Sequence, residues 1–230
     1  ESFAVEQVEL TKGPSSTFAG RGTAGGAVNS ITKQASTDYS FTNAEAGVGT
    51  DNHLRLTAVS NWKLSDKVAV RANLLYAYEE VPDRAPADRK RYGAAVSAVF
   101  KPSDTLTMLL DYYHLTAKDF PDLGSWFDAT GGKPVRKVPV YAQQGDFLKS
   151  DVDTVTARLK WQPIDGLRIE NSARYGNAHN SYVNTGARAA TRSLLDPVAP
   201  GAVDATLDNG HQGWQEVSYY VDQLNIYGDF

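Results

Sequence analysis

The side chains best suited to bind a ligand lie in two long polar segments, residues 118–150 and 179–214. The first contains Trp126, Phe127, Arg136, Lys137, Tyr141, Gln143 and Gln144. The second contains His179, Tyr182, Arg188, Arg192, His211 and Trp214. Arginine can neutralise an anion and aromatic rings can cover flat groups, so the composition fits a flat-sided anion. Polar loops with a few anchoring aromatics are also ordinary protein surface. We select as candidate contacts Trp126, Tyr141, Gln143 and Arg188.

A Gly-rich stretch at residues 13–26 is the other candidate region. Its glycines permit positive φ and close backbone approach; they are Gly13, Gly20, Gly22, Gly25 and Gly26. A phosphate-binding loop is excluded because no Gly-Lys-Ser/Thr ends the stretch and a strand pattern follows it. Tight packing remains an alternative for each glycine. Within the stretch, Arg21 could pair with carboxylates of a surrounding wall or face an anionic ligand, and Phe18 could contact the same ligand.

Other kinds of chemistry find no support in the composition. The chain has no Cys, and its four His show no metal-ligand spacing. No Ser-His-Asp arrangement and no pair of carboxylates stands out. The formal charge of −4 comes without a basic stripe, which argues against nucleic acid. We therefore expect a protein that is not an enzyme and has no metal site and no cofactor.

From about residue 38 the chain alternates apolar and polar residues with period two, which indicates β-strands. In one such segment Leu74 and Tyr76 share the apolar face, and Arg71 and Asn73 share the polar face. The segments run about 10–13 residues, longer than the usual 5–6. No window of 18 apolar residues exists, and the mean hydropathy is −0.40. Long two-faced strands of this kind suit a membrane barrel with lipid outside and water inside.

Three short turns repeat one pattern: an aromatic residue, Asp four positions later and an apolar residue six positions later. The aromatic residues are Trp62, Phe100 and Trp161. Long connections alternate with these turns, at residues 81–90, 118–150 and 179–214. Outer-membrane barrels have short periplasmic turns, long extracellular loops and aromatic girdles, so the pattern predicts sidedness. Three ordinary hairpins of a soluble β-protein remain the alternative.

The charged side chains of the alternating segments share the polar face and are expected to line the inside of the barrel. On the lipid face each Arg would cost about 2–4 kcal/mol at mid-depth. These residues are Arg55, Arg71, Glu79, Asp111, Arg158, Glu170 and Arg174. We expect them to contact whatever fills the barrel.

The N-terminal stretch resembles the end of the plug domain of TonB-dependent receptors. The shared pattern runs from Val8-Glu-Leu-Thr-Lys-Gly-Pro to Thr32-Lys33, and its motif residues are Gly13, Pro14, Gly20, Gly22, Gly25, Gly26 and Asn29. Barrel segments such as Gly145-Asp-Phe-Leu148 and Ala173-Arg-Tyr-Gly176 are similar to catecholate siderophore receptors of the Fiu type. One departure is Ala19, where many siderophore receptors carry a ligand-facing Tyr.

The resemblance implies an all-β fold: the end of a plug domain at residues 1–37, then about eight antiparallel strands of an incomplete transmembrane barrel at residues 38–230. Plugged transporters close with about 22 strands, so we interpret the sequence as a fragment. It has no signal peptide at its start.

The implied function is uptake of ferric siderophores across the Gram-negative outer membrane. The implied partners are the siderophore, outer-membrane lipid and the TonB–ExbB–ExbD complex, the last acting through a region that this chain lacks. Three alternatives stay open: a receptor for another siderophore or a sugar, a passive porin-like barrel, and a soluble carbohydrate-binding β-domain.

Overall fold

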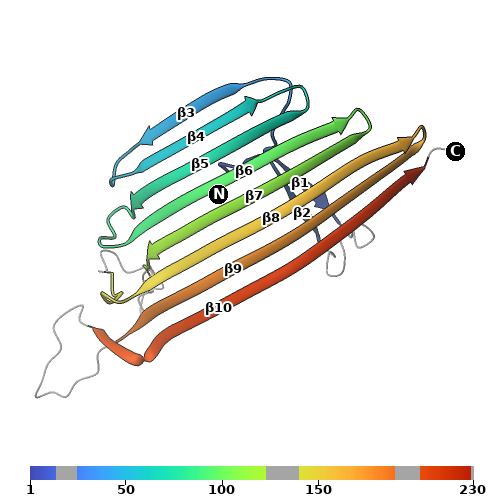
Figure 1. The fold of residues 1–230 in the computed structure, drawn as a ribbon. Coiled ribbons are helices and arrows are strands. Elements are labelled where there is room, and N and C mark those ends of the chain that lie inside the picture. Colours follow the sequence, from blue (N-terminus) through green and yellow to red (C-terminus); the bar gives the residue numbers. More distant parts are fainter. Residues whose placement is uncertain (14–24, 123–139, 190–202, 229–230) are drawn as a thin grey trace, which may run out of the picture.

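Every regular element in the described part of the chain is a β-strand. The computed structural model describes residues 1–13, 25–122, 140–189 and 203–228 (Figure 1). A two-stranded sheet is formed by β1 (Val5–Lys12) and β2 (Gly26–Thr32). An eight-stranded sheet is formed by β3 (Phe41–Val48), β4 (Leu54–Lys63), β5 (Val68–Glu80), β6 (Asp88–Ser103), β7 (Leu106–Phe120), β8 (Phe147–Ile164), β9 (Leu167–Ala189) and β10 (Val203–Gly228).

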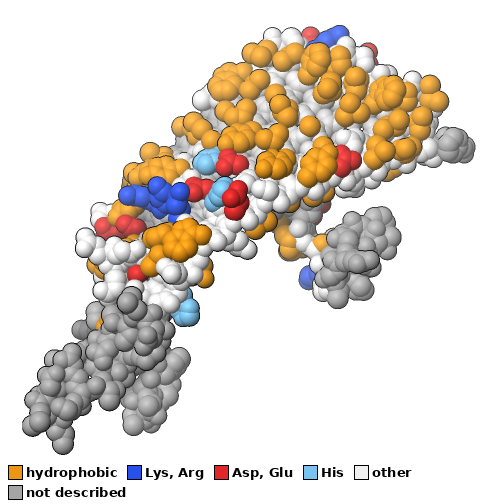
Figure 2. All heavy atoms as spheres, turned by 60° about the horizontal axis from the view of Figure 1, so that its bottom comes forward, with side chains coloured by type: hydrophobic (Ala, Val, Ile, Leu, Met, Phe, Trp, Pro, Cys, Tyr) orange, Lys and Arg blue, Asp and Glu red, His pale blue; other side chains and the backbone are white. Residues whose placement is uncertain are grey.

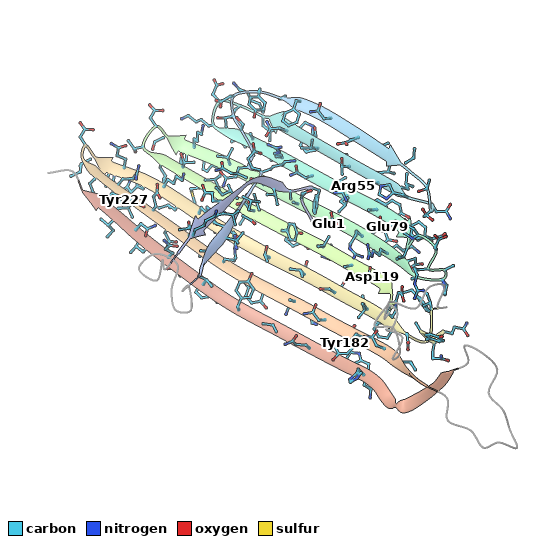
Figure 3. The ribbon with its side chains drawn as sticks, turned by 180° about the vertical axis from the view of Figure 1, so that it is seen from behind. Glu1, Arg55, Glu79, Asp119, Tyr182 and Tyr227 are labelled. Atoms are coloured by element: carbon cyan, nitrogen blue, oxygen red, sulfur yellow. The ribbon has the colours of Figure 1, made fainter. Side chains whose placement is uncertain are left out.

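The large sheet is a meander in which each strand pairs antiparallel with the next, from β3 at one edge to β10 at the other. Seen from behind, the small sheet lies across one face of the large one (Figure 3). We call this the inner face and the opposite one the outer face. The all-β fold with about eight antiparallel barrel strands is confirmed. No helix in the described residues is long and apolar enough to cross a membrane.

The two faces of the large sheet differ as the alternation predicted. On the outer face Leu74 is 52% exposed and Val96 40%, whereas their inner-face neighbours Asn73 and Ser97 are 1% and 2% exposed. Orange side chains cover much of the outer face in Figure 2. An apolar surface left open beside a buried polar one reverses the arrangement of a water-soluble sheet. This inversion fits lipid on the outer face.

The aromatic residues of the three short turns lie on one inclined line. Trp62 pairs through Val70 with Ala98, so Phe100 lies two residues beyond that row. Phe100 pairs through Met108 with Leu159, and Trp161 again lies two residues beyond. The line moves two residues along the strands, about 6.8 Å, for every two strand spacings, about 9.6 Å. It is therefore inclined by about 35° to the direction perpendicular to the strands. Since barrel strands tilt by about 35–45°, the three rings share one depth and form a girdle.

The sequence predicted a long connection at residues 179–214, and the predicted extent is wrong. β9 runs to Ala189 and β10 begins at Val203, with His211 paired to Asn184 and Trp214 to Ser181. The strands from β6 onward span 15 to 26 residues, which also exceeds the expected lengths. Backbone ladders need no apolar side chains, and strands that extend beyond the lipid have water on their outer face. The apolar alternation therefore ends before the strand does.

Candidate functional site

The segment after β2 is bonded to the inner face by Asn61, whose side chain is fully buried. Asn61 Nδ2 donates to Ser36 O (2.9 Å) and Tyr39 O (2.5 Å), and its Oδ1 accepts from Ser36 N (2.9 Å). One β4 side chain thus replaces the backbone partners that this irregular segment would otherwise lack.

Neighbouring inner-face side chains bond the same segment. Ser97 Oγ accepts from Ala35 N (3.1 Å), Arg71 Nη1 donates to Gln34 O (3.3 Å), and Lys101 Nζ donates to Thr37 Oγ1 (2.7 Å). These three side chains come from β5 and β6. Together with Asn61 of β4, they hold residues 34–39 against three adjacent strands. Arg71 thus contacts the segment after β2 on the inner face, the face to which alternation assigned its side chain.

Phe3 fills an apolar socket on the inner face, farther from the short turns than Asn61. Its ring is 7% exposed and stacks on Tyr113 with centroids 5.7 Å apart. The socket also includes Leu75 and Ala95. Gly93 forms its floor, because a Cβ built there would lie 2.6 Å from the Phe3 ring. The glycine is what allows an aromatic side chain of the N-terminal segment to lie flat on the sheet.

Charged residues gather on the inner face at the ends of β4 to β7 that lie away from the short turns. Arg91 binds Asp119 through two nitrogen–oxygen contacts, and Arg55 Nη1 lies 3.1 Å from Glu1 Oε2. Glu79 accepts from Arg89 (3.1 Å) and faces His53 (3.2 Å). Figure 3 shows Glu1 and Arg55 side by side, with Glu79 and Asp119 toward the same end of the sheet.

Most of these groups line a recess of about 240 Å³, formed by Glu1, His53, Arg55, Glu79, Arg89 and Arg91 among others. Each of its three guanidinium groups is paired with a carboxylate: Arg55 with Glu1, Arg89 with Glu79 and Arg91 with Asp119. Guanidinium groups offer planar, bidentate hydrogen bonding to anionic oxygens. An anion in this recess would therefore compete with these carboxylates for the guanidinium groups.

Asp146 fixes the segment that leads into β8. It is 4% exposed and accepts from Gln143 N (3.0 Å), Thr185 N (2.8 Å) and Thr185 Oγ1 (2.8 Å). The Asp146 amide in turn donates to Gln143 O (2.9 Å). Several N–H and O–H donors stabilise the charge of this buried carboxylate, so it needs no cation beside it. It ties the predicted ligand contact Gln143, and Tyr141 beside it, to β9.

A second tie joins the loop after β5 to the chain after β7. Arg84 Nε lies 2.5 Å from Asp122 Oδ2, and Arg84 Nη2 lies 2.7 Å from Asp122 Oδ1. This bidentate hydrogen bonding raises the pKa of the Arg84 guanidinium above its ordinary value. This pair therefore links the two connections at the loop end.

Several predicted site residues fall outside the described residues: Pro14, Phe18, Gly20, Arg21, Gly22 and Trp126. Arg188 belongs to the last residues of β9, where its backbone pairs with Asp204. Tyr141 and Gln143 lie between the described ends of β7 and β8. Their role as ligand contacts stays a prediction.

The described plug-motif residues surround the small sheet. Gly13 and Gly26 have positive φ (87° and 135°), and a Cβ at Gly26 would meet Thr11 O at 2.2 Å. Gly13 N donates to Gly25 O (3.2 Å), and Asn29 Nδ2 donates to Glu9 Oε2 (3.1 Å). Within the described residues they shape the adjoining ends of β1 and β2 and bond the two strands to each other.

Sequence reasoning did not single out Glu1, Arg89, Asp119 or Asp146. Arg89 and Arg91 occupy the odd positions of β6, whose even positions are largely apolar, so alternation could have placed them on the inner face. Asp119 could have been found in the same way on β7. Asp146 lies in the segment Gly145-Asp-Phe-Leu148 that carries part of the resemblance, but its bonds could not be predicted from it, because its donors at Gln143 and Thr185 are distant in sequence from each other. Within the described residues, no group of three or more His, Cys, Asp or Glu could hold a metal ion.

No family model matches this chain. Among curated proteins it is similar to the probable TonB-dependent siderophore receptor PiuA of Acinetobacter baumannii, with 35% identity over 195 residues. It is similar to the probable TonB-dependent receptor BfrD of Bordetella pertussis, with 33% identity over 193 residues. Each alignment covers 80% of this chain and 26% of the relative. The catecholate siderophore receptor Fiu of Escherichia coli is 29% identical over 216 residues, covering 86% of this chain and 28% of Fiu. The chain thus spans about a quarter of the length of these relatives.

Solved structures agree with these sequences. The crystal structure of the siderophore receptor PiuA superposes with a TM-score of 0.84 at 29% identity, covering all of this chain and 33% of PiuA. The closed form of the ferric-catecholate import receptor Fiu superposes with a TM-score of 0.76 at 26% identity, covering all of this chain and 34% of Fiu.

Proposed function

Since this chain is homologous to a segment of TonB-dependent siderophore receptors, we propose that the protein to which it belongs imports ferric siderophores through the outer membrane of a Gram-negative bacterium. The catecholate class is our specific choice, because the relative Fiu is named for it. The chain's own contribution is part of the barrel wall and the docking surface for the N-terminal segment.

The observation that carries this proposal is the occupied inner face. Residues 34–39 are hydrogen-bonded to four side chains of the wall, and Phe3 fills a socket with a glycine floor. A passive pore needs an open, water-filled interior. A wall built to hold protein instead favours a gated transporter. We assign residues 1–37 to the plug and residues 38–230 to the barrel on this basis.

The arginine-lined recess is the proposed place of first contact with the anionic siderophore. Arg55, Arg89 and Arg91 supply guanidinium groups, which the ligand would take over from their carboxylate partners, and Tyr141 and Gln143 lie on the loop end that Asp146 holds. We keep as further candidate contacts the residues Phe18, Arg21, Trp126 and Arg188.

Transport in this proposal involves binding and release of iron that is already chelated. The homologues are transport receptors, and the proposal needs neither a catalytic group nor a resident cofactor. We propose that energy comes from the TonB–ExbB–ExbD complex; the names of BfrD and PiuA, both TonB-dependent, support the TonB part of this proposal.

Uptake of radioactive iron by the full-length receptor tests the function. A strain lacking its own siderophore receptors would express the protein and receive iron as ferric catecholate, ferric hydroxamate or ferric citrate. We expect saturable uptake of the catecholate only, abolished when TonB is deleted. Uptake that is unsaturable and independent of TonB would overturn the proposal in favour of a passive pore. Uptake of another chelate alone would overturn the catecholate assignment.

A matched pair of variants tests the recess. Arg89→Gln with Arg91→Gln removes two charges from the recess, whereas Lys63→Gln with Lys67→Gln removes two charges at the short turns. We expect the first pair to raise the Kd for the ferric catecholate at least tenfold and the second to leave it unchanged. Equal affinities in both pairs would place the ligand elsewhere.

A further inference from the structure

One ion pair of the arginine-lined recess differs from the other two in the origin of its carboxylate. Glu1, the partner of Arg55, comes from the N-terminal segment, and Figure 3 shows it reaching Arg55 of β4 from there. Among the described residues, this is the ion pair that joins residues 1–37 to the large sheet. The pairs formed within the wall are Arg89–Glu79 and Arg91–Asp119.

The carboxylate of Glu1 is also held by fewer contacts than those of the wall. Glu1 and Arg55 meet through one nitrogen–oxygen contact of 3.1 Å, and their side chains are 23% and 33% exposed. The contacts of the wall carboxylates are double: Asp119 with two nitrogens of Arg91, and Glu79 with Arg89 and His53. Because Glu1 belongs to no strand of the large sheet, it can also move away without disturbing a backbone ladder. It is therefore the carboxylate that an incoming anion displaces at least cost.

The rest of the N-terminal segment keeps Glu1 beside the recess. Phe3 fills its socket, the Lys33 amide donates to Ala4 O (2.9 Å), and Lys33 Nζ donates to Phe3 O (3.2 Å). A group tethered in this way has a high effective concentration at its partner. Glu1 thus acts on Arg55 as an attached anion, with which a free anion must compete.

We propose that Glu1 is a built-in competitor that sets the charge a ligand must carry to take over Arg55. This role presupposes the proposed function, in which the ligand is an anionic ferric siderophore. A neutral ligand that took the guanidinium group from Glu1 would leave a partly buried carboxylate unpaired, which is costly. An anionic ligand replaces that carboxylate and lets it return to water. Glu1 therefore selects ligands by charge.

This selection matches the chemistry of iron chelates. In a ferric catecholate the phenolate oxygens carry more charge than the iron, so the complex is an anion. In a ferric hydroxamate each positive charge of the iron is met by one hydroxamate, so the complex is neutral. The same guanidinium group thus favours the first chelate over the second as long as Glu1 occupies it.

Removal of Glu1 has a sign that distinguishes a competitor from a structural tie. Loss of a tie would weaken ligand binding or leave it unchanged, whereas loss of a competitor strengthens binding. Because partly exposed ion pairs are weak, the gain should be about twofold to fivefold. By linkage, an anion in the recess must loosen the docking of residues 1–5 by the same factor.

The first test compares the Kd of three full-length receptors for the ferric complex of dihydroxybenzoate: the parent, Glu1→Gln and Glu6→Gln. Glu6 is an exposed residue of β1 outside the recess, so its substitution removes the same charge from the same part of the chain. We expect Glu1→Gln to bind about twofold to fivefold more tightly than the parent, and Glu6→Gln to bind like the parent. Equal or weaker binding by Glu1→Gln would overturn the proposal.

The second test uses no siderophore. Hydrogen exchange of the Lys33 amide follows the docking of residues 1–5, because that amide donates to Ala4 O. Inorganic phosphate, compared with chloride at equal ionic strength, should accelerate this exchange in the parent but not in Glu1→Gln. Equal exchange of the parent in both salts would overturn the proposal. If the parent did not bind the ferric complex while phosphate still accelerated exchange, the proposed function would be refuted and competition by Glu1 would stand.

Discussion

The glycine under Phe3 offers the sharpest test of how the N-terminal segment is held. In Gly93→Ala the new methyl group would lie 2.6 Å from two atoms of the Phe3 ring and 3.3 Å from Leu75 Cβ. The first distance is far below van der Waals contact, and the backbone of β6 is fixed by pairing on both sides. We therefore expect the Phe3 ring to leave its socket.

The cost follows from what the ring loses. Burial of a Phe side chain is worth about 1.5–3 kcal/mol, and a stacked aromatic pair adds about 0.5–1.5 kcal/mol. Undocking of residues 1–5 should therefore become easier by about 2–4 kcal/mol, or roughly 30-fold or more in population. The barrel itself should assemble normally, because the socket is formed by side chains that remain packed on one another.

Hydrogen exchange of the Lys33 amide reports the event. That amide donates to Ala4 O (2.9 Å), so it is protected only while residues 1–5 are docked. We expect exchange at Lys33 in the full-length receptor to accelerate by the same factor in Gly93→Ala. The matched control is Gly47→Ala, where the nearest atoms lie 3.9 Å from the new Cβ.

A double-mutant cycle isolates the contact. On a Phe3→Ala background the additional Gly93→Ala change should have almost no effect, because the ring it displaces is absent. Exchange at Lys33 that is unchanged in Gly93→Ala, or equally faster in both backgrounds, would refute the reasoning from the socket.

Three further predictions concern the loop end and the lipid face. Asp146→Asn keeps one acceptor oxygen, replaces the other by an NH2 group that cannot accept from Thr185 or Gln143, and removes the charge; we expect weaker ferric-siderophore binding with unchanged barrel assembly on gels, and a smaller effect for Thr185→Val, which keeps two of the three bonds and the charge. Leu74→Arg puts a charge on the lipid face and should lower folded barrel in the membrane by a cost of about 2–4 kcal/mol, whereas Leu64→Arg in a short turn should not. Normal assembly of Leu74→Arg would contradict a lipid-facing outer surface. The Arg84 pKa is higher in the folded protein than its ordinary value. The ion pair therefore adds its full stability at any pH below that ordinary pKa, and this stability is lost only as the pH rises through the pKa of the folded state. Protease resistance of residues 81–87 should therefore stay flat from about pH 6 to about pH 9 in the parent and be lower throughout in Arg84→Gln, and a fall in the parent over that range would show that another group controls the loop.

The sequence by itself determined which face of each strand meets lipid. Alternation is local: successive side chains point to opposite faces, so Leu74 and Arg71 could be assigned without knowing any partner strand. The three short turns could also be predicted from the sequence, because an aromatic residue, a turn Asp and an apolar residue recur at fixed spacing. The expectation of about eight antiparallel barrel strands came with the resemblance to TonB-dependent receptors.

Only the tertiary structure decided where the strands end and what the inner face holds. The outer parts of β9 and β10 pair through their backbones, and backbone hydrogen bonds leave no trace in side-chain pattern. The socket of Phe3 joins residues 90 positions apart, and Asn61 binds carbonyl groups that any residue could supply. The common inclination of Trp62, Phe100 and Trp161 also needed the strand register, because depth in a membrane is a property of the assembled sheet.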